Sequence, residues 1–334
     1  MIKEYCKKGA LVVLISVCFV IFTHISASAA GKVIRFAHEA MIESPWGITT
    51  EKFREEVEKR TEGRVKVKVF YGGSLAGASE AIQMVKIGTA EMYMDVIGTW
   101  GTAMFSPLLV FDMPFIFKDT DHIIAVGKSP IMKKLADEMV KKTGVRILGT
   151  VTDQQRVIMS NKPIRTPDDM KGLKIRSAEI ATNVAMYKAL GALPTTIPWG
   201  ELYTSLATKI VEGMAAAPRT GWQYKFYEVL KYMNLTYHQS YLETFCINEK
   251  FLKSLEPRDQ KAVVEAWAVA EDYGNKTQKE KFFPDHLKKV KEHGMELIEV
   301  DRAAFEEKLK DFHKQFVGKL FSEELYNSIK SYKY

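Results

Sequence analysis

The chain has 334 residues, of which 46% are hydrophobic and 27% are charged. This composition is typical of a globular protein: it is too apolar for a disordered chain and too charged for a protein with many membrane spans. The length suggests about two domains. Because there are only three cysteines, the sequence excludes a disulfide-rich scaffold.

The first 29 residues have the pattern of a cleaved signal peptide. Three lysines precede an apolar run at residues 9–22, and Ala27-Ser28-Ala29 forms a cleavage site. The alternative is a membrane anchor, but the run is shorter than the roughly 20 residues that a spanning helix needs. Cleavage would remove three lysines and one glutamate and lower the net charge from +7 to +5. We therefore expect the protein in the periplasm.

After cleavage, Cys246 would be the only cysteine, so no internal disulfide could form. It lies in an apolar, strand-like run, and we predict that it packs in the core rather than acting as a catalytic thiol. The charged residues alternate in sign along the chain, as around Lys288-Lys289-Val290-Lys291. This pattern is typical of a solvated helix face and gives no indication of nucleic-acid binding.

The part of the chain that follows the leader alternates strands and helices. Ser44 is placed to cap a helix that has Pro45 at its first position. Valines alternate with lysines in residues 65–69, which is the period of two of a half-buried strand. We predict strands at 32–38, 65–70 and 91–97 and helices at 44–61 and 79–88. This order indicates an α/β domain with a largely parallel sheet.

The rest of the chain is predicted to be mixed at first and then mostly helical. The apolar segment 107–117 contains prolines and is interpreted as a buried connection. We predict strands at 145–150, 156–160 and 173–177, a short extended segment at 195–198, a one-turn helix capped by Thr166, and helices at 121–142, 178–190, 201–208, 256–273, 275–293 and 302–317. There is no flexible linker, so we expect the chain to cross between two lobes more than once through strands.

Short motifs for catalysis, nucleotides and metals are missing from the sequence. It has no G-x-x-x-x-G-K-[ST], no G-x-G-x-x-G after the first strand, no H-E-x-x-H and no G-x-S-x-G. The histidines are spread without metal-ligand spacing. We therefore predict no catalytic residue, no cofactor and no metal, and a binding protein is favoured over a secreted enzyme, which stays the alternative.

Residues 163–213 contain a series of closely spaced motifs. They are D-M-K-G-L-K-I-R ending at Arg176, G-A-L-P at 191–194, E-L-Y at 201–203 with a leucine at 206, and V-E-G at 211–213. Further motifs are R-F-A-H at 35–38, T-E-G-R at 61–64 and M-P-F at 113–115. This pattern resembles the solute-binding subunits, of the DctP type, of tripartite ATP-independent periplasmic (TRAP) transporters. The likeness covers nearly the whole chain after the leader.

The resemblance implies a two-lobe α/β fold, the type II-like periplasmic binding protein fold, with a ligand cleft between the lobes and a long C-terminal helix that braces both. The expected division is 30–152 plus 243–281 for lobe I and 153–242 plus 282–334 for lobe II. The implied function is capture of a small organic anion, such as a C4-dicarboxylate or a keto or hydroxy acid. The implied partners are the small and large TRAP membrane subunits, and the protein is expected to be a monomer. An alternative with the same fold is a ligand sensor for a sensor kinase.

Two arginines are the main candidates for binding. The resemblance implies that Arg176 holds a ligand carboxylate with two parallel hydrogen bonds and that Arg156 assists. Arg176 also ends a predicted strand, where α/β folds place ligands, and a guanidinium group matches a carboxylate in shape and charge. A salt bridge within the lobe is the alternative for Arg176. Trp199 is predicted to stack on the ligand, with packing in the core as its alternative.

Three carboxylates are further candidates. Glu39 follows the first strand and could accept a hydrogen bond from a ligand hydroxyl or ammonium group, or it could be a solvated loop charge. Glu179 and Glu243 lie at positions that face the cleft in some family members.

The chain departs from the family at residues 214–218. Ala216 stands where the family commonly has an asparagine that can bond the ligand. The pocket wall is therefore expected to be more apolar, which argues against a heavily hydroxylated sugar acid. It leaves room for a small dicarboxylate, a keto or hydroxy acid, an aromatic acid or a short sulfonate.

Overall fold

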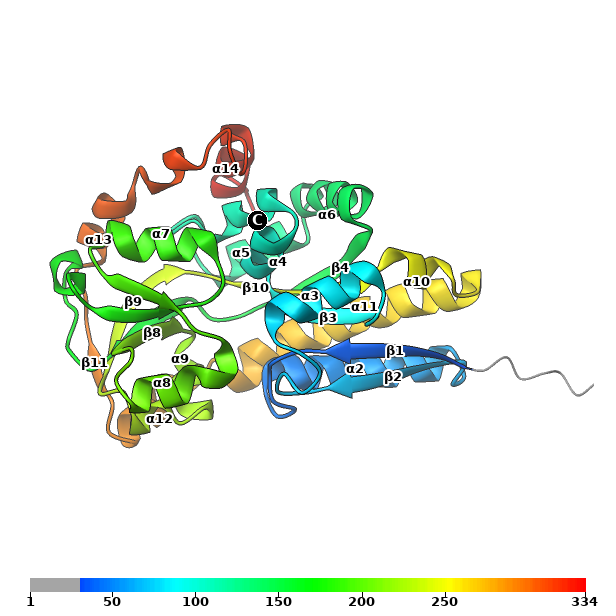
Figure 1. The fold of residues 1–334 in the computed structure, drawn as a ribbon, viewed down its shortest axis with the longest axis horizontal. Coiled ribbons are helices and arrows are strands. Elements are labelled where there is room, and N and C mark those ends of the chain that lie inside the picture. The colour runs from blue at the N-terminus through cyan, green and yellow to red at the C-terminus, as the bar shows by residue number, and fades with distance from the viewer. Residues whose placement is uncertain (1–30) are drawn as a thin grey trace, which may run out of the picture. The chain divides into compact units, whose positions relative to one another are not determined.

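The computed structural model describes residues 31–334, so the predicted signal peptide lies outside the described residues. Strands and helices alternate along most of this part of the chain (Figure 1). The strands are β1 (Lys32–Ala37), β2 (Val65–Phe70), β3 (Met92–Val96), β4 (Val145–Thr152), β5 (Arg156–Ser160), β6 (Lys174–Ser177), β7 (Leu193–Thr196), β8 (Gly213–Ala216), β9 (Tyr232–Gln239), β10 (Leu242–Asn248) and β11 (Glu296–Ile298). The helices are α2 (Pro45–Arg60), α3 (Ala78–Ile87), α4 (Ile97–Ala103), α5 (Thr120–Gly127), α6 (Pro130–Thr143), α7 (Ala181–Ala189), α8 (Leu202–Ala207), α9 (Pro218–Gln223), α10 (Glu249–Lys253), α11 (Pro257–Thr277), α12 (His286–Glu292), α13 (Arg302–Leu309) and α14 (Glu323–Lys330).

The first sheet has the strand order β2-β1-β3-β10-β4. β1 and β3 are parallel, as predicted, but β10 is antiparallel to both of its neighbours, β3 and β4. Because β10 is antiparallel to both neighbours, β3 and β4 run in the same direction, and β10 is the exception to the predicted, largely parallel arrangement. The reason is that β4 leaves the sheet at Thr152 and β10 enters it at Leu242, directly opposite, so the two strands run in opposite directions.

The second sheet has the order β11-β9-β5-β8-β6-β7. The chain passes from the first sheet to the second between β4 and β5 and returns between β9 and β10. This agrees with the expectation that strands carry the chain between two lobes more than once. The lobe boundaries themselves stay a prediction, and α14 packs against α6, whose residues fall in predicted lobe I.

Several local predictions are confirmed. The Ser44 hydroxyl accepts a hydrogen bond from the backbone N–H of Gly47 at 3.1 Å, and Pro45 occupies the first turn of α2. In β2, Val65 and Val67 are buried, while Lys66 and Lys68, which alternate with them, are exposed. Buried side chains on alternate residues allow the strand to cover a core on one face only.

Two long helices that the sequence predicted are broken in the structure. The one predicted at 121–142 is divided into α5 and α6, because Ser129 caps a new helix that starts at Pro130. The one predicted at 275–293 is replaced by the end of α11, a π-helical segment (Gln278–Phe282) and α12, with Pro284 between the last two. Proline lacks the N–H of a helical hydrogen bond and disfavours helix in the residue before it. The helix predicted at 302–317 ends at Leu309, and β8 and β9 were not predicted.

Separate apolar clusters pack around the first sheet and around the second sheet. Under the first sheet, Phe245 of β10 and Trp267 of α11 have ring centres 4.1 Å apart, and Phe53 of α2 packs on the same indole. Full burial of one such side chain stabilises the fold by roughly 1.5–3 kcal/mol. Cys246 is buried and unpaired in this sheet, as predicted.

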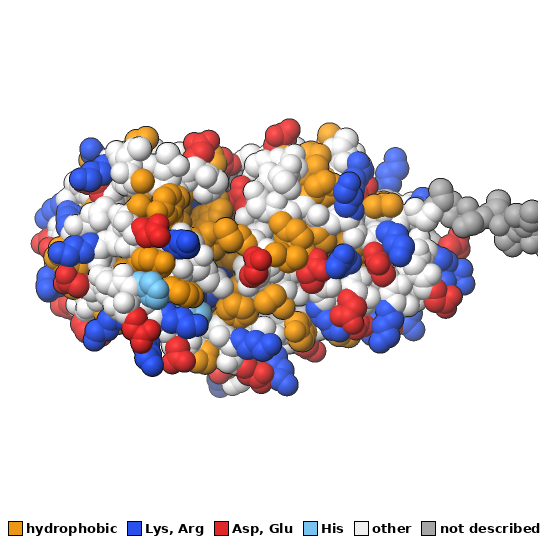
Figure 2. Space-filling view, turned by 90° about the horizontal axis from the view of Figure 1, so that it is seen from below, with side chains coloured by type: hydrophobic (Ala, Val, Ile, Leu, Met, Phe, Trp, Pro, Cys, Tyr) orange, Lys and Arg blue, Asp and Glu red, His pale blue; other side chains and the backbone are white. Residues whose placement is uncertain are grey.

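The helix α11, with 21 residues, connects the two halves of the fold. It packs against α2 and β4 of the first half, and the π-helical segment leads from it to α12, which packs against α9 of the second half. In the described part of the chain, no helix has both the length and the apolar character needed to cross a bilayer. Basic and acidic side chains are interspersed on the face shown in Figure 2, and Lys288 pairs with Glu292 on α12, as expected for a solvated helix face.

Candidate ligand-binding site

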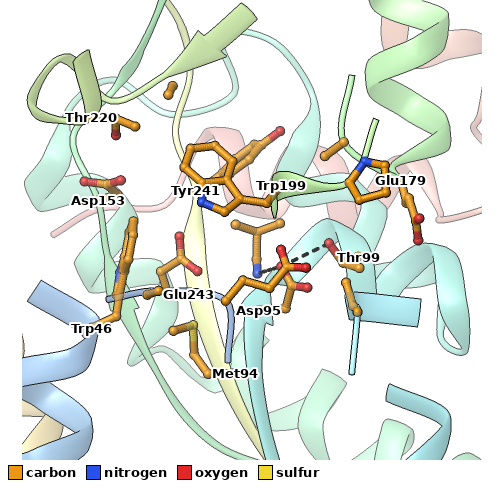
Figure 3. A pocket seen from close by; sticks show the side chains of 18 of the residues that line it. Trp46, Met94, Asp95, Thr99, Asp153, Glu179, Trp199, Thr220, Tyr241 and Glu243 are labelled. Carbon is orange, nitrogen blue, oxygen red and sulfur yellow. Dashed lines mark hydrogen bonds between the residues drawn. The ribbon is translucent and has the colours of Figure 1, made fainter. Parts of the chain in front are cut away.

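A cavity of about 330 Å³ lies between the two sheets (Figure 3). It is bordered by the carboxyl ends of β3, β6 and β8 and by the first residues of the antiparallel strands β5 and β10. This is the edge at which α/β sheets place ligands. All six residues that the sequence singled out line this cavity, namely Glu39, Arg156, Arg176, Glu179, Trp199 and Glu243.

Arg176 is buried at the end of β6, with 7% of its surface exposed. Its Nε donates a hydrogen bond to the carbonyl oxygen of Ile197 at 2.9 Å, and its Cζ lies 5.6 Å from the ring centre of Trp199. Within residues 31–334 it has no salt bridge, so the alternative of a structural ion pair is not what the structure shows there. Burial, and secondly the nearby charge of Arg156, lowers the pKa of Arg176 to about 10.

Arg156 stands at the start of β5, partly buried. Its Cζ lies 4.0 Å from the ring centre of Tyr241, and one of its terminal amino groups donates to the carbonyl of Ala215. Its Nε is buried and has no hydrogen-bond partner, and the described residues include no salt bridge to it. Two guanidinium groups therefore border one cavity without forming an ion pair in the described residues, which favours binding of an anion between them.

Trp199 both packs against other aromatic side chains and lines the cavity. Its ring packs edge-on against Tyr224, with ring centres 5.0 Å apart, and against Phe226 at 5.9 Å. The side chain is only half-buried and lines the cavity, where Figure 3 shows the indole above Glu243 and Asp95. The packing fixes the ring in place, and the ring then forms a wall of the cavity.

Glu39 and Glu179 are half-buried at the border between the two halves. Burial raises the pKa of Glu39, with Arg176 acting in the opposite direction and Glu179 adding to the rise. Glu179 accepts a hydrogen bond from the hydroxyl of Ser79 at the start of α3. This contact joins a residue of the first half to one of the second.

Glu243 is nearly completely buried, with 5% of its surface exposed, and faces the cavity. Burial, followed by the charges of Asp153 and Asp95, raises the pKa of Glu243 well above its usual value. Its carboxylate lines the cavity (Figure 3) and accepts none of the side-chain hydrogen bonds found in residues 31–334. A carboxyl group in such surroundings is either protonated or needs a cation or a hydrogen-bond donor to stabilise its charge.

Asp95 is a site residue that sequence reasoning missed. It lies near the end of β3 and accepts hydrogen bonds from the backbone N–H of Val96 at 2.6 Å and from Thr99 at 3.3 Å. Burial, and then the charge of Glu39, raises the pKa of Asp95 to about 7. The signal that could have found it is its position at the carboxyl end of a predicted parallel strand.

A second feature that the sequence did not reveal is the pair Arg219–Asp153. Arg219 of α9 is completely buried and donates from Nε and a terminal amino group to the two Asp153 oxygens, at 3.0 and 2.9 Å. Its Cζ also lies 4.1 Å from the ring centre of Trp46 at the start of α2. The pair joins α9 to the crossover segment after β4, and it leaves Asp153 at the cavity wall with its charge already matched.

These features define a class of protein: a two-lobe solute-binding protein whose cleft presents charged and aromatic side chains. No group of histidine, cysteine and acidic side chains in residues 31–334 is suited to hold a metal. The family model of the bacterial extracellular solute-binding proteins, family 7 (DctP), matches residues 36–319. The chain belongs to this family.

Individual relatives give the same result. The 2,3-diketo-L-gulonate-binding periplasmic protein YiaO of Escherichia coli is 32% identical over 293 residues, which cover 85% of this chain and 86% of YiaO. A TRAP periplasmic solute-binding protein of Xanthobacter autotrophicus with bound β-D-galacturonate superimposes with a TM-score of 0.85 at 26% identity, covering 90% of this chain and all (100%) of that one. A TRAP protein of Sulfurospirillum deleyianum with bound succinate gives 0.85 at 27% identity, covering 91% and 100%. The predictions of family and of a two-lobe fold are confirmed.

Proposed function

We propose that this protein captures a small organic acid outside the cytoplasm and delivers it to the membrane subunits of a TRAP transporter. The observation that carries the proposal is the pair of arginines, Arg156 and Arg176, which border one cavity without an ion-pair partner in the described residues. Two relatives of similar fold hold succinate and galacturonate, both of which are carboxylates.

In this proposal, Arg176 is the anchor of the ligand carboxylate. Its Nε bond to Ile197 fixes the guanidinium plane and leaves the terminal amino groups for the ligand. A carboxylate can accept two parallel hydrogen bonds from such a group. Arg156, whose Nε has no partner, supplies the second cation. In a closed and dry cleft, loss of one partner of such a pair costs roughly 3–5 kcal/mol.

Capture would be coupled to closure of the two lobes, with 30–152 plus 243–281 moving against 153–242 plus 282–334. The ligand would shift the population to the closed form, because only that form offers contacts from both lobes. The contacts Ser79–Glu179 and Trp46–Arg219 already join the halves beside the cavity, and they support this view.

The lining of the cavity favours a small ligand with few hydroxyl groups. Ala216 and Ala217 line it and offer no side-chain hydrogen bond. A dicarboxylate, a keto or hydroxy acid, an aromatic acid or a short sulfonate would need fewer polar partners than a sugar acid.

We also infer binding without turnover, by an exported protein that acts as a monomer. No histidine or cysteine of residues 31–334 lines the cavity, so its lining offers neither a histidine as general base nor a cysteine thiol as nucleophile. Recovery of the bound acid chemically unchanged after long incubation is the expected result, and its conversion would favour the enzyme alternative.

The test is a thermal-shift screen of the exported chain with succinate, 2-hydroxyglutarate, pyruvate, phenylacetate, isethionate, galacturonate and the common amino acids. A ligand at about 100 times its dissociation constant should add roughly 2.7 kcal/mol, which is a shift of several degrees in Tm. We expect Arg176→Ala to abolish the shift and Arg165→Ala, at an exposed position away from the cavity, to keep it. A ligand that binds equally well to Arg176→Ala would contradict the proposed anchor.

A further inference from the structure

We infer that the ligand is a zwitterion: a small acid whose carboxylate lies at Arg156 and Arg176 and whose cationic nitrogen lies among Glu39, Asp95 and Glu243. The inference rests on the proposed function, since it names the ligand class of the same site. It predicts amino acids, imino acids or betaines as ligands in preference to acids without nitrogen.

The two arginines and the three carboxylates come from different sides of the cavity. Arg156 in β5 and Arg176 in β6 belong to the second sheet. Asp95 and Glu243 lie in the neighbouring strands β3 and β10 of the first sheet, and Glu39 lies two residues after β1. The register pairs Ala37 with Tyr93, and Thr244 with Asp95. Glu39, Asp95 and Glu243 thus meet at one edge of that sheet. The cavity has a positive wall and a negative wall.

Within residues 31–334, Glu39, Asp95 and Glu243 form no salt bridge, and the charges of Arg176, Arg219 and Arg156 act on Glu39 and Glu243 only from a distance. The hydrogen bonds to Asp95 come only from neutral donors, namely Val96 N–H and the hydroxyls of Thr99 and Tyr93. Glu243 is 5% exposed, lines the cavity (Figure 3) and accepts none of the side-chain hydrogen bonds found in residues 31–334. A buried carboxylate of this kind needs either a cation or a proton.

Protons are the competing explanation, and two observations favour a cationic nitrogen. An acid without nitrogen would leave three neighbouring carboxyl groups to be neutralised by protons near neutral pH, whereas one cation can interact with all three. The aromatic rings of Tyr93 and Tyr224 also line the cavity, whereas the rings of Trp46 and Trp199 already lie against Arg219 and Arg176. Aromatic faces attract cations, and ammonium groups in particular.

The first experiment compares matched ligands by calorimetry on the wild-type exported chain. The sets are L-glutamate with 2-hydroxyglutarate and glutarate, glycine betaine with 3,3-dimethylbutanoate, and L-proline with cyclopentanecarboxylate. Within a set the carboxylate and the shape are kept, and the cationic nitrogen is lost. We expect the nitrogen-containing member of at least one set to bind roughly 30-fold or more tightly than its partners, which is the effect of a buried charge pair.

The second experiment uses Glu243→Gln, which keeps the shape of the side chain and removes its charge. We expect it to weaken binding of the nitrogen ligand by roughly 30-fold or more, while Glu324→Gln, on the exposed surface of α14, leaves it unchanged. If Glu243→Gln does not fold, Asp95→Asn takes its place with the same expectation.

The outcomes separate this inference from the proposed function. If the best ligand has no cationic nitrogen and binds Glu243→Gln as well as or better than the wild type, the inference is wrong and the proposed function stands. If none of these acids binds, the proposed function is contradicted together with the inference. If binding survives Arg176→Ala, the proposed anchor is wrong, and the inference, which places the ligand carboxylate there, is wrong with it.

Discussion

Two buried arginines of the second lobe, Arg219 and Arg176, have opposite environments. Arg219 is matched by the two oxygens of Asp153 and lies against the ring of Trp46. Arg176 has one hydrogen bond, to the carbonyl of Ile197, and no ion-pair partner among residues 31–334. Both are at least nine-tenths buried, so neither can rely on water to solvate its charge.

The difference separates a structural arginine from one available to a ligand. A buried charge is stable when its partner is within the same chain, and the Arg219–Asp153 pair therefore fixes the crossover segment to α9. A buried charge without such a partner destabilises the ligand-free protein, and this cost is recovered when an anion binds. The contrast can be tested by removing each charge in turn.

The largest effect is expected at Arg219. Arg219→Met would leave Asp153 buried and unpaired, and we expect a loss of about 3–5 kcal/mol in the free energy of unfolding. Urea denaturation measures it. The double variant Arg219→Met with Asp153→Leu removes both charges and should recover most of the loss. A single variant as stable as the wild type would show that the pair has no structural role.

At Arg176, we expect the change in the free energy of unfolding to have the opposite sign. Arg176→Met removes an unmatched buried charge, so we expect the ligand-free protein to gain about 1–2 kcal/mol of stability while losing its ligand. Denaturation without ligand and calorimetry with ligand measure the two effects. Equal destabilisation by Arg176→Met and Arg219→Met would remove the distinction between the two arginines.

A smaller effect concerns the negative wall. The pKa of Asp95 is about 7 in the folded protein, above its ordinary value of 3.8, so the folded state holds an extra proton between these values. Its contribution to stability is therefore complete below about pH 4 and is lost as the pH rises through 7. Asp112 and Glu271 have pKa values raised to about 7 as well and act in the same direction.

The variant Asp95→Asn isolates the part that belongs to this residue. Without ligand, its stability relative to the wild type should increase between pH 4 and pH 7 by an amount on the order of 1 kcal/mol. Thermal unfolding of both proteins over this range measures the change. Parallel curves would show that Asp95 keeps an ordinary pKa.

The smallest effect is expected at the exposed contact between the halves. Ser79→Ala removes the hydrogen bond to Glu179, and we expect a change in stability within about 0.5 kcal/mol, because water can replace the bond. Urea denaturation again gives the value. A loss above about 2 kcal/mol would mean that this contact, rather than the buried Arg219–Asp153 pair, holds the halves together.

Local signals in the sequence were sufficient for much of the fold. The cap at Ser44, the alternation in β2 and the apolar run around Cys246 each depend on near neighbours in the chain, and each was confirmed. Helix breaks at Pro130 and Pro284 were overlooked although the prolines were visible. The direction of β10 could not be predicted, because it depends on where the chain returns from the second sheet.

The sequence by itself determined the family and the two candidate arginines, since these depend on residue types at fixed spacing. It did not determine which charges are matched. Arg219 and Asp153 are 66 residues apart, and Asp95 meets Glu39 and Glu243 only through the pairing of three strands. Only the tertiary structure decides such neighbours, because burial and counter-charge are properties of distance in space. That is why the negative wall of the cavity became visible in the fold and not in the sequence.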